Sequence, residues 1–292
     1  MPRPSPFATE QLEVRTADGV VLTGTVFEPE TPKAVCVMAH AMFARRSSFE
    51  RPLGRGLARF FASRGVRVIT FDFRAHGESS RPERVSYDDL VRFDLPAVVN
   101  AAAARARKLR VIVLGHSLGG HVALAAQGAA FMNASRVIAV GSNVWIPSLE
   151  PSRVRWWVKR ASSELALRVT ERVGKFPARA LRIGSDDEPL DYMMGLFRGA
   201  RDGSWCSDDG TLNYLANLSR VTVPVLAMLS DGDRITCHPD PGERFVRRIQ
   251  GEVQIERIRR SDDGSAPPGH MEMVTTESCR SAWERAVTWC TA

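Results

Sequence analysis

A serine between two glycines lies at the boundary between an apolar run and a stretch of small residues. Gly115, Ser117 and Gly119 follow an apolar run at residues 111–114 and open a stretch of small residues that reaches about residue 130. At a strand-to-helix turn, a serine adopts strained backbone angles that project its Oγ above the sheet, and small residues on both sides let strand and helix approach closely. The three letters alone occur by chance, but in this setting they predict a nucleophile at Ser117 rather than a packing turn.

A nucleophilic serine requires an acid and a base, since its hydroxyl is a poor nucleophile at neutral pH. An imidazole takes the proton, and a carboxylate fixes the tautomer of the imidazole and stabilises its cation. In this arrangement the acid follows the serine along the chain and precedes the histidine. The loop after the apolar run 225–229 offers Asp231 and Asp233, either of which could instead form an Asx turn. Asp233 is the preferred acid because it lies farther beyond the strand end, and Asp231 is the alternative.

The preferred base is His270, one of six histidines. It follows the last predicted strand and a loop rich in glycine and proline (residues 264–269), and it precedes the final predicted helix. A loop in this position can bring an imidazole toward Ser117. The competing histidines follow the acid too soon or flank the nucleophile rather than face it: His238, His116 and His121.

Acyl transfer also requires two preorganised backbone donors for the developing oxyanion. The N–H of Leu118 is one of them, favoured by the start of its helix. The loop after the apolar run 35–38 is expected to supply the other from the N–H of Met42.

Short apolar runs alternate with helical spacing along most of the chain. Two extended segments flank a turn signal at residues 17–19 and predict an antiparallel hairpin. Strands separated by helices join through right-handed crossovers, so the fold predicted is α/β, with a mostly parallel eight-stranded sheet. The predicted strands are residues 11–16, 20–27, 34–38, 66–71, 111–114, 137–140, 225–229 and 253–258. The predicted helices are residues 49–63, 87–104 with Ser86 as the N-cap, 118–130, 243–249 and 271–289.

Residues 142–218 interrupt this alternation. No strand is evident there, but helices are predicted at residues 152–173 and 192–197. An insertion at this point lies over the carboxyl ends of the strands, where open α/β sheets bind ligands. We therefore predict a core of residues 1–141 and 219–292 and a helical cap of residues 142–218. The tryptophans of the cap either attach it to the core or join a substrate pocket, for which the candidates are Ala41, His116, Asn143, Trp145, Trp156 and Met193.

Together these residues resemble the α/β-hydrolase superfamily, in particular the lysophospholipase and serine-aminopeptidase-like hydrolases with a helical cap. Besides the serine turn, residues 38–41 look like the family's oxyanion loop and residues 71–79 like its Asp-x-Arg-Gly-x-Gly-x-Ser segment. Residues 224–233 and 269–272 look like its acid and histidine loops. By the family's spacing the acid is Asp233.

The chain departs from the family pattern at three positions. Ala41 and Ala75 stand where glycine is usual, and Ser230 replaces the common glycine before the acid loop. Ala41 narrows the approach to the oxyanion, which bears on rate or acyl preference. The resemblance gives the polar residues of the 71–79 segment a role in shaping a loop beside the site: Asp72, Arg74, His76 and Ser79.

These residues predict a serine esterase that works through an acyl-enzyme, without a metal or organic cofactor, on a small acyl substrate with an apolar portion. A thioesterase, acyltransferase or cyclase would use the same residues. An amidase or aminopeptidase would need an amine site, for which Asp186, Asp187 and Glu188 are candidates. The alternative from another class is a non-catalytic ligand-binding relative. A dehalogenase would have aspartate at position 117.

Composition bears on the remaining classes of protein. The formal charge is +7 and the pI about 9.6, but the basic residues are scattered and no nucleic-acid motif is present. No nucleic-acid partner is expected, and an anionic substrate stays possible. Five widely spaced cysteines without a C-x-x-C pair indicate neither a disulfide framework nor a zinc site. No apolar run is long enough to span a bilayer and the first six residues lack a secretory signal, so a cytoplasmic protein is expected.

Overall fold

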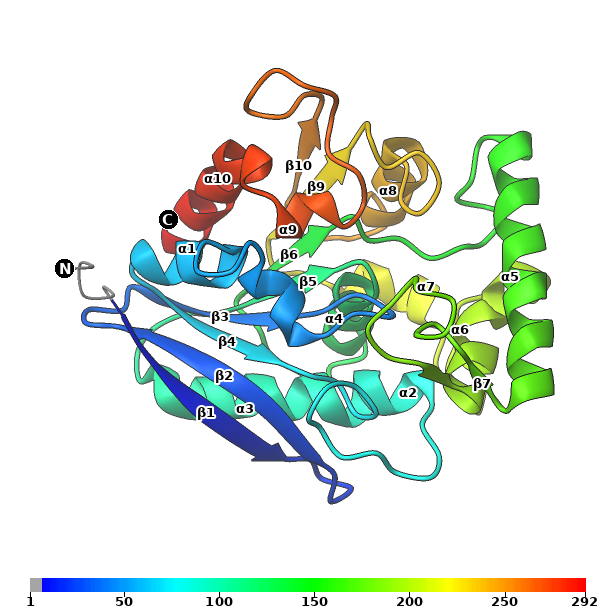
Figure 1. Ribbon diagram of the computed structural model, residues 1–292, viewed down its shortest axis with the longest axis horizontal. Coiled ribbons are helices and arrows are strands. Elements are labelled where there is room, and N and C mark those ends of the chain that lie inside the picture. The colour runs from blue at the N-terminus through cyan, green and yellow to red at the C-terminus, as the bar shows by residue number, and fades with distance from the viewer. Residues whose placement is uncertain (1–6) are drawn as a thin grey trace.

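The computed structural model describes residues 7–292, so the expectation about a secretory signal rests on residues outside that range. An eight-stranded sheet runs through the molecule in the order β1-β2-β4-β3-β5-β6-β9-β10 (Figure 1). β2 pairs antiparallel with β1 and β4, and all the other neighbours are parallel, which confirms the predicted fold class. The strands are β1 (Phe7–Arg15), β2 (Val21–Pro29), β3 (Ala34–Ala39), β4 (Val66–Phe71), β5 (Val111–His116), β6 (Arg136–Val140), β9 (Val225–Ser230) and β10 (Val253–Ile258).

The central strands are mostly apolar because both faces of the sheet are covered. All six residues of β3 are buried, and alternate side chains enter two different hydrophobic clusters. The cluster that contains Val35 and Val37 includes residues of α3 (Leu95–Ala106) and α4 (Leu118–Gly128). The other, with Cys36 and Met38, includes residues of α1 (Leu57–Ser63) and α10 (Arg280–Thr291). Helices therefore lie on both sides of the sheet, as Figure 1 shows.

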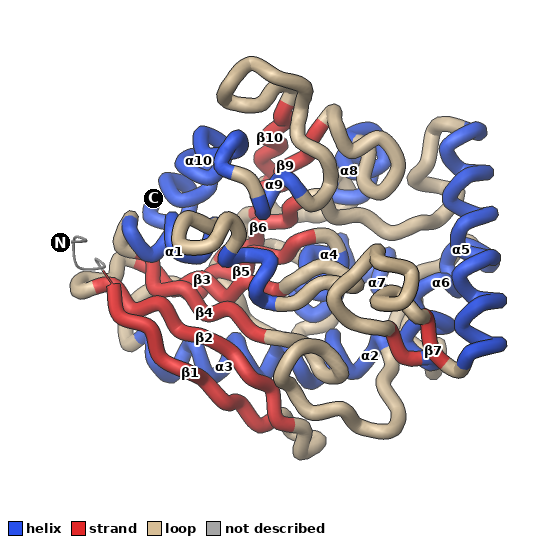
Figure 2. Tube along the Cα trace, viewed as in Figure 1, coloured by secondary structure: helices blue, strands red, loops and turns tan. Residues whose placement is uncertain are grey.

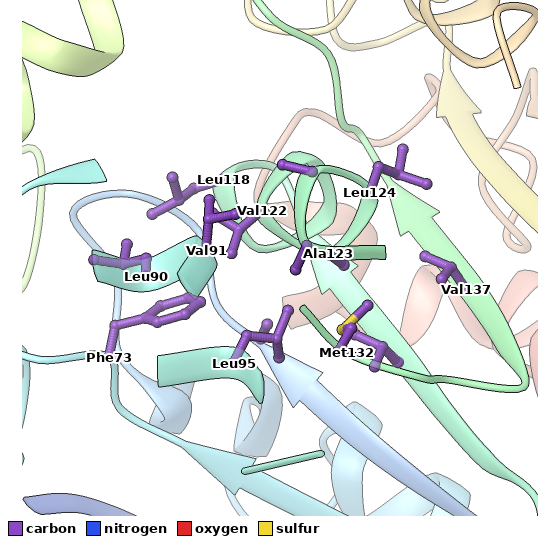
Figure 3. Packing of buried hydrophobic residues seen from close by; sticks show 14 of the residues in the cluster. Phe73, Leu90, Val91, Leu95, Leu118, Val122, Ala123, Leu124, Met132 and Val137 are labelled. Carbon is purple, nitrogen blue, oxygen red and sulfur yellow. The ribbon is translucent and has the colours of Figure 1, made fainter. Parts of the chain in front are cut away.

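The helix that carries the serine turn is held by apolar packing. Figure 3 shows Leu118 and Val122 of α4 beside Val91 and Leu95, and all four side chains are buried. Leu95 opens α3, which continues from the short α2 (Tyr87–Asp89) through a π-helical turn at Leu90–Asp94. Ser86 is the N-cap of this run, as predicted. It also forms a capping box, because its side chain accepts from the Asp89 amide and the Asp89 side chain accepts from the Ser86 amide. The start of α4 is thus fixed by a continuous core.

Two predicted helices are shorter or broken in the structure. The helix expected at residues 49–63 covers only α1, preceded by the 3-10 turn Arg46–Glu50. Pro52 has no amide hydrogen and Gly54 has a φ of +80°, so the chain between the two turns leaves helical geometry and Leu53 is 89% exposed.

The C-terminal helix expected at residues 271–289 divides into α9 (Glu272–Thr275), a 3-10 turn (Glu277–Cys279) and α10. The Thr275 and Thr276 hydroxyls donate to the carbonyls of Met271 and Glu272, and Thr276 is extended. Side-chain bonds of this kind compete with the backbone bonds that would continue a helix. The helix expected at residues 243–249 is α8 (Pro239–Val246), which starts earlier because His238 caps it.

The inserted segment, residues 142–218, contains α5 (Arg153–Val173), α6 (Leu190–Asp202) and α7 (Tyr214–Asn217) (Figure 2). The expectation that it has no strand is wrong, since β7 (Lys175–Phe176) pairs with β8 (Glu188–Pro189) and an isolated bridge joins Cys206 to Asn213. These pairings are two residues or fewer, too short to show in an alternating pattern.

Two tryptophans of the inserted segment contact the rest of the chain. Trp205 is buried, with its ring 5.5 Å from that of Phe245 in α8. Trp145 Nε1 donates to the Thr236 carbonyl at 2.9 Å. Both therefore attach the segment to the sheet domain. In residues 7–292, no helix combines the length and apolar character needed to cross a bilayer.

Candidate active site

Ser117 occupies the sharp turn between β5 and α4. Its φ of +53° and ψ of −113° lie in a region that side-chain-bearing residues rarely adopt. The turn needs glycine on both sides, because a Cβ on Gly115 would lie 2.3 Å from the Gly119 carbonyl carbon and one on Gly119 would lie 2.1 Å from the Ala39 oxygen. The Ser117 amide donates to the Val140 carbonyl of β6 at 2.8 Å. The sheet thus holds the serine in a strained position at the carboxyl ends of the strands.

Asp233 and His270 form a hydrogen-bonded pair. His270 Nδ1 lies 2.5 Å from Asp233 Oδ2, and Asp233 is 3% exposed. Burial acts to raise the pKa of Asp233, but the hydrogen bond and charge of His270 outweigh it, so the pKa is lowered. Asp231 instead accepts from Arg257 Nε at 2.6 Å near the surface. Of the two candidate acids, Asp233 is the one that contacts His270.

The imidazole of His270 lies beside Gly141, the residue that follows β6, and contacts His116, the residue before Ser117. A Cβ on Gly141 would come within 3.3 Å of His270 Cε1 and Nδ1, so glycine leaves room for the ring. The His116 ring centroid lies 4.9 Å from that of His270, and His116 Nε2 lies 3.0 Å from the His270 carbonyl oxygen. Among the hydrogen bonds of residues 7–292 there is none between Ser117 and His270.

The sequence did not predict that His116 is buried against the His270 loop. It is fully buried, and burial together with the nearby His270 lowers the pKa of His116 to about 3. A neutral imidazole can donate from Nε2 to the His270 carbonyl without placing a second positive charge beside the pair. His116 therefore holds the His270 loop against the serine turn rather than lining the cavity.

Met42 and Leu118 line the same cavity as Ser117. Within the described residues, neither amide donates to a protein acceptor. Two unpartnered N–H groups beside a serine are the arrangement that an oxyanion requires.

The loop that carries Met42 is clamped by the inserted segment. Phe43 has a φ of +64°, a strained value for a residue with a side chain. Its amide donates to Glu188 Oε1 at 2.6 Å, and its carbonyl accepts from the Ser185 amide at 2.7 Å. The Phe43 ring also lies 5.3 Å from that of Phe176 in β7. The inserted segment therefore fixes the residue next to Met42.

Of the three carboxylates considered for an amine site, Asp186 and Glu188 are used in this clamp instead, and Asp187 pairs within the inserted segment. Asp186 and Glu188 are buried, and Asp186 accepts from Arg81 and Arg45 and, at 3.1 Å, from the Gly77 amide. Asp187 accepts from the Arg179 amide and pairs with Lys175. None of the three lines the cavity at Ser117. The sequence signal for this role is weak, because the run of acids reads equally well as a solvated turn.

The polar residues of the 71–79 segment form hydrogen bonds within that segment and to neighbouring parts of the chain. Asp72 accepts from the Arg46 amide at 2.8 Å, and Arg74 lies between Asp94 and Asp18. Ser79 Oγ donates to the Asp72 carbonyl at 2.6 Å. Ala75, where the family usually has glycine, has a φ of +64°. These contacts shape a loop, and none of the residues lines the cavity.

We expect Glu188→Ala to lower kcat by about ten- to a hundredfold with little change in KM, because loss of the Phe43 contact lets the Met42 amide move and one oxyanion donor is worth about 10²–10³ in kcat. Glu188→Gln keeps an acceptor for the Phe43 amide and should restore most of the rate. Steady-state kinetics on a dissolved ester measures both. Asp187→Asn is the matched control. A loss in Glu188→Ala that appears only in KM, or no rescue by glutamine, would contradict this role.

The Glu188 contact to His76 makes this clamp sensitive to pH. His76 is buried with Nε2 3.1 Å from Glu188 Oε2. Burial acts to lower the pKa of His76, but the Glu188 charge and hydrogen bond outweigh it and raise the pKa to about 9 from the ordinary 6.5. A raised folded-state pKa stabilises the fold fully below about pH 6.5, and this contribution is lost as the pH rises through about 9.

His76→Gln should therefore destabilise the protein by about 1–3 kcal/mol more at pH 6 than at pH 10. Urea unfolding at the two pH values measures the difference in the free energy of unfolding. His238→Gln, at a partly exposed histidine, is the control and should show no such trend. An equal cost of His76→Gln at both pH values would show that the ion pair does not contribute.

A cavity of about 70 Å³ opens beside the serine. It is lined by Met42, Ser117, Leu118, His121, Asn143, Val144, Trp145, Leu196, Phe197 and Thr236. Of the predicted pocket residues, Asn143 and Trp145 are among them, but Ala41, His116, Trp156 and Met193 are not. Met193 is fully buried in the core and Trp156 lies on α5, so helical spacing did not show which side of each helix faces the cavity. Leu196 and Phe197 of α6 were not foreseen.

Within residues 7–292, no group of three histidine, cysteine or carboxylate side chains is arranged to hold a metal ion.

Comparison with known proteins decides the family. The alpha/beta hydrolase family matches residues 36–276 of this sequence. The chain belongs to the alpha/beta hydrolase family. Among curated proteins, this alpha/beta hydrolase is 34% identical over 110 residues to a monoacylglycerol lipase of Mycolicibacterium smegmatis, covering 37% of each chain. It is 30% identical over 112 residues to an sn-1-specific diacylglycerol lipase of Danio rerio, covering 38% of this chain and 32% of that one. The alignments thus span about a third of each relative.

Solved structures extend the likeness of fold to nearly the whole alpha/beta hydrolase. An esterase of Pyrococcus furiosus superposes with a TM-score of 0.64 at 17% identity, covering 99% of this chain and 92% of that one. An esterase of Exiguobacterium antarcticum gives a TM-score of 0.63 at 17% identity, covering 96% and 99%. At 17% sequence identity, this structural similarity shows that the fold is shared.

Proposed function

We propose that this alpha/beta hydrolase is a serine hydrolase that cleaves carboxylic esters, with Ser117 as nucleophile, His270 as base and Asp233 as the acid that orients it. The observation that carries the proposal is the 2.5 Å hydrogen bond from His270 Nδ1 to buried Asp233, in the chain order that this fold uses. The names of the partial relatives, a monoacylglycerol and a diacylglycerol lipase, support an ester substrate.

In the proposed mechanism, His270 Nε2 takes the proton of Ser117 as Oγ attacks the ester carbonyl. The Met42 and Leu118 amides hold the oxyanion of the tetrahedral intermediate. Its collapse breaks the carbonyl–alkoxide bond, and the proton passes from His270 to the leaving alcohol. Water then repeats the attack on the acyl-enzyme with His270 as base, which releases the carboxylic acid and restores Ser117.

The inserted segment acts in this proposal as a cap that shapes the substrate site. Leu196, Phe197 and Trp145 give the cavity an apolar wall, which suits the acyl portion of an ester. Asn143 Nδ2 is buried without a hydrogen-bond partner in the described residues, and Asn143 lines the cavity. A buried donor left unpaired by the protein is suited to a substrate oxygen.

A panel of p-nitrophenyl esters of increasing acyl length, with matched thioesters and anilides, tests the proposal. Esters should be turned over fastest, and a fluorophosphonate probe should label the peptide that contains Ser117. Fast turnover of thioesters alone would favour a thioesterase, and anilide cleavage an amidase. No labelling and no turnover would point to a non-catalytic ligand-binding protein.

A further inference from the structure

Helix α5 fully buries mainly polar residues, which is unusual for a helix on the surface of a protein. The residues that it buries are Lys159, Ser163, Leu167 and Thr170, three of which are polar. Lys159 Nζ pairs with Glu150 at 2.9 Å, and the Ser163 hydroxyl donates to the Lys159 carbonyl. A surface helix ordinarily turns its apolar stripe to the core and its polar face to water. Leu167 and the partly buried Ala166 and Val169 are the apolar residues of α5 that pack against the core, and several other apolar residues of the helix are exposed.

Those apolar residues face outward in one line. Val154 is 76% exposed, Trp157 62%, Val158 46% and Leu165 64%, and Ala161 between them is also exposed. Their spacing of three and four residues places them on one side of the helix. We call these five residues the α5 stripe. Figure 1 shows α5 at the outer edge of the molecule, away from the sheet. A contiguous exposed apolar surface of this kind marks an interaction site.

The charges around the α5 stripe indicate what it meets. Arg153, Arg160, Arg168 and Arg172 are exposed along the helix, against one exposed carboxylate, Glu171. The remaining carboxylate, Glu164, is paired with Arg201 at 2.8 Å. The Arg160 guanidinium lies 5.8 Å from the centre of the Trp157 ring, so cation and aromatic face the same surroundings.

This charge pattern distinguishes two possible occupants of the α5 stripe. A second copy of the chain would bring arginine-rich helices together, which like-charge repulsion opposes. An anionic lipid surface complements the arginines and accepts the apolar side chains, and tryptophan favours the headgroup level. We propose that the α5 stripe docks this protein on the surface of a membrane that contains anionic lipid.

Docking at this face would bring the cavity wall close to the bilayer. Lys159, on the inner side of α5, lies 5.5 Å from the centre of the Trp145 ring, and Trp145 lines the cavity beside Ser117. The helix therefore connects the docking face with the wall of the candidate active site. The docking itself does not depend on the proposed ester hydrolysis.

Co-sedimentation with vesicles tests the proposal, using the full chain with Ser117→Ala so that lipid is not consumed. Binding should be strong to vesicles that mix phosphatidylglycerol with phosphatidylcholine, weak to phosphatidylcholine alone, and reduced by added salt. Trp157→Ser combined with Leu165→Ser should raise the lipid concentration for half-binding by about tenfold or more, since each side chain contributes substantially when buried in lipid. Arg160→Gln with Arg168→Gln should weaken the binding and its dependence on salt.

Leu53→Ser is the matched control, because Leu53 is 89% exposed and precedes α1 in the chain, and Figure 1 shows α1 on the opposite side of the molecule from α5. It should bind as the parent does. Circular dichroism checks that the α5 variants are folded. Made in the chain that keeps Ser117, the same variants should turn over a dissolved short ester at the parental rate. Equal binding to neutral and anionic vesicles, equal loss in Leu53→Ser, or a dimer in solution that the α5 variants dissociate would each overturn the proposal.

Discussion

Ser117→Ala is expected to lower turnover of an activated ester by about 10⁴-fold or more, and His270→Ala by a similar factor. Ser117 supplies the bond to the acyl group and His270 the proton transfer, so removal of either leaves only the oxyanion donors and substrate binding to accelerate the reaction. Because the two groups act as one unit, the double variant should be about as slow as each single variant. Steady-state rates for the three variants give the comparison.

A histidine outside the site provides the control for these losses. His238 caps α8 and is partly exposed, so His238→Ala should keep turnover within about twofold of the parent. The strained turn at Ser117 does not require the hydroxyl, and the thermal midpoint of Ser117→Ala should stay near that of the parent. Retention of more than about a tenth of the rate in Ser117→Ala would show that another group is the nucleophile.

Asp233→Asn has the next largest expected effect, a loss of about 10⁴-fold in kcat, as seen when the acid of a comparable triad is replaced by its amide. Asparagine keeps the shape of the side chain, but its NH₂ group can face His270 Nδ1 and favour the wrong tautomer. The negative charge that stabilises the imidazolium is also lost. Because Asp233 is only 3% exposed, solvent compensates little for the lost charge.

Asp231→Asn is the matched substitution two residues away. Asp231 pairs with Arg257 near the surface, where an ion pair contributes about 0–1 kcal/mol, so kcat should stay within about twofold of the parent. Measured side by side, the two variants separate a role in orienting His270 from a role in shaping the loop. If Asp231→Asn is far slower than Asp233→Asn, the assignment of the acid is wrong.

The candidate site depends in part on contacts from the inserted segment. Glu188 and Ser185 hold the Phe43 backbone, and Phe43 adjoins the expected oxyanion donor Met42. In the proposed mechanism, the inserted segment therefore shapes the substrate site and also positions one of the proposed oxyanion donors. Substitutions in it are expected to change rate as well as substrate preference.

Much of the sheet was predictable because its signals are local. The β-branched runs at β4 and β10 match the structure residue for residue, and the hairpin turn and the Ser86 cap lie where short-range patterns place them. Helix ends were less predictable. The apolar spacing of residues 49–63 suggests one helix, but Pro52 and Gly54 interrupt it. Thr275 and Thr276 divide the helix that was expected at residues 271–289.

The sequence by itself determined the serine turn, the chain order of Ser117, the acid and His270, and the strands that carry them. These features depend on residue type and on spacing between nearby residues, both of which can be read directly from the sequence. Only the tertiary structure decided which aspartate meets His270, that Glu188 is buried against Phe43, and that α5 turns Trp157 and Leu165 to the outside. The first two are contacts between segments far apart in the chain, and the third depends on which side of α5 such contacts cover. Such contacts follow from how the whole core packs, and periodicity alone cannot show which side of a helix the core covers.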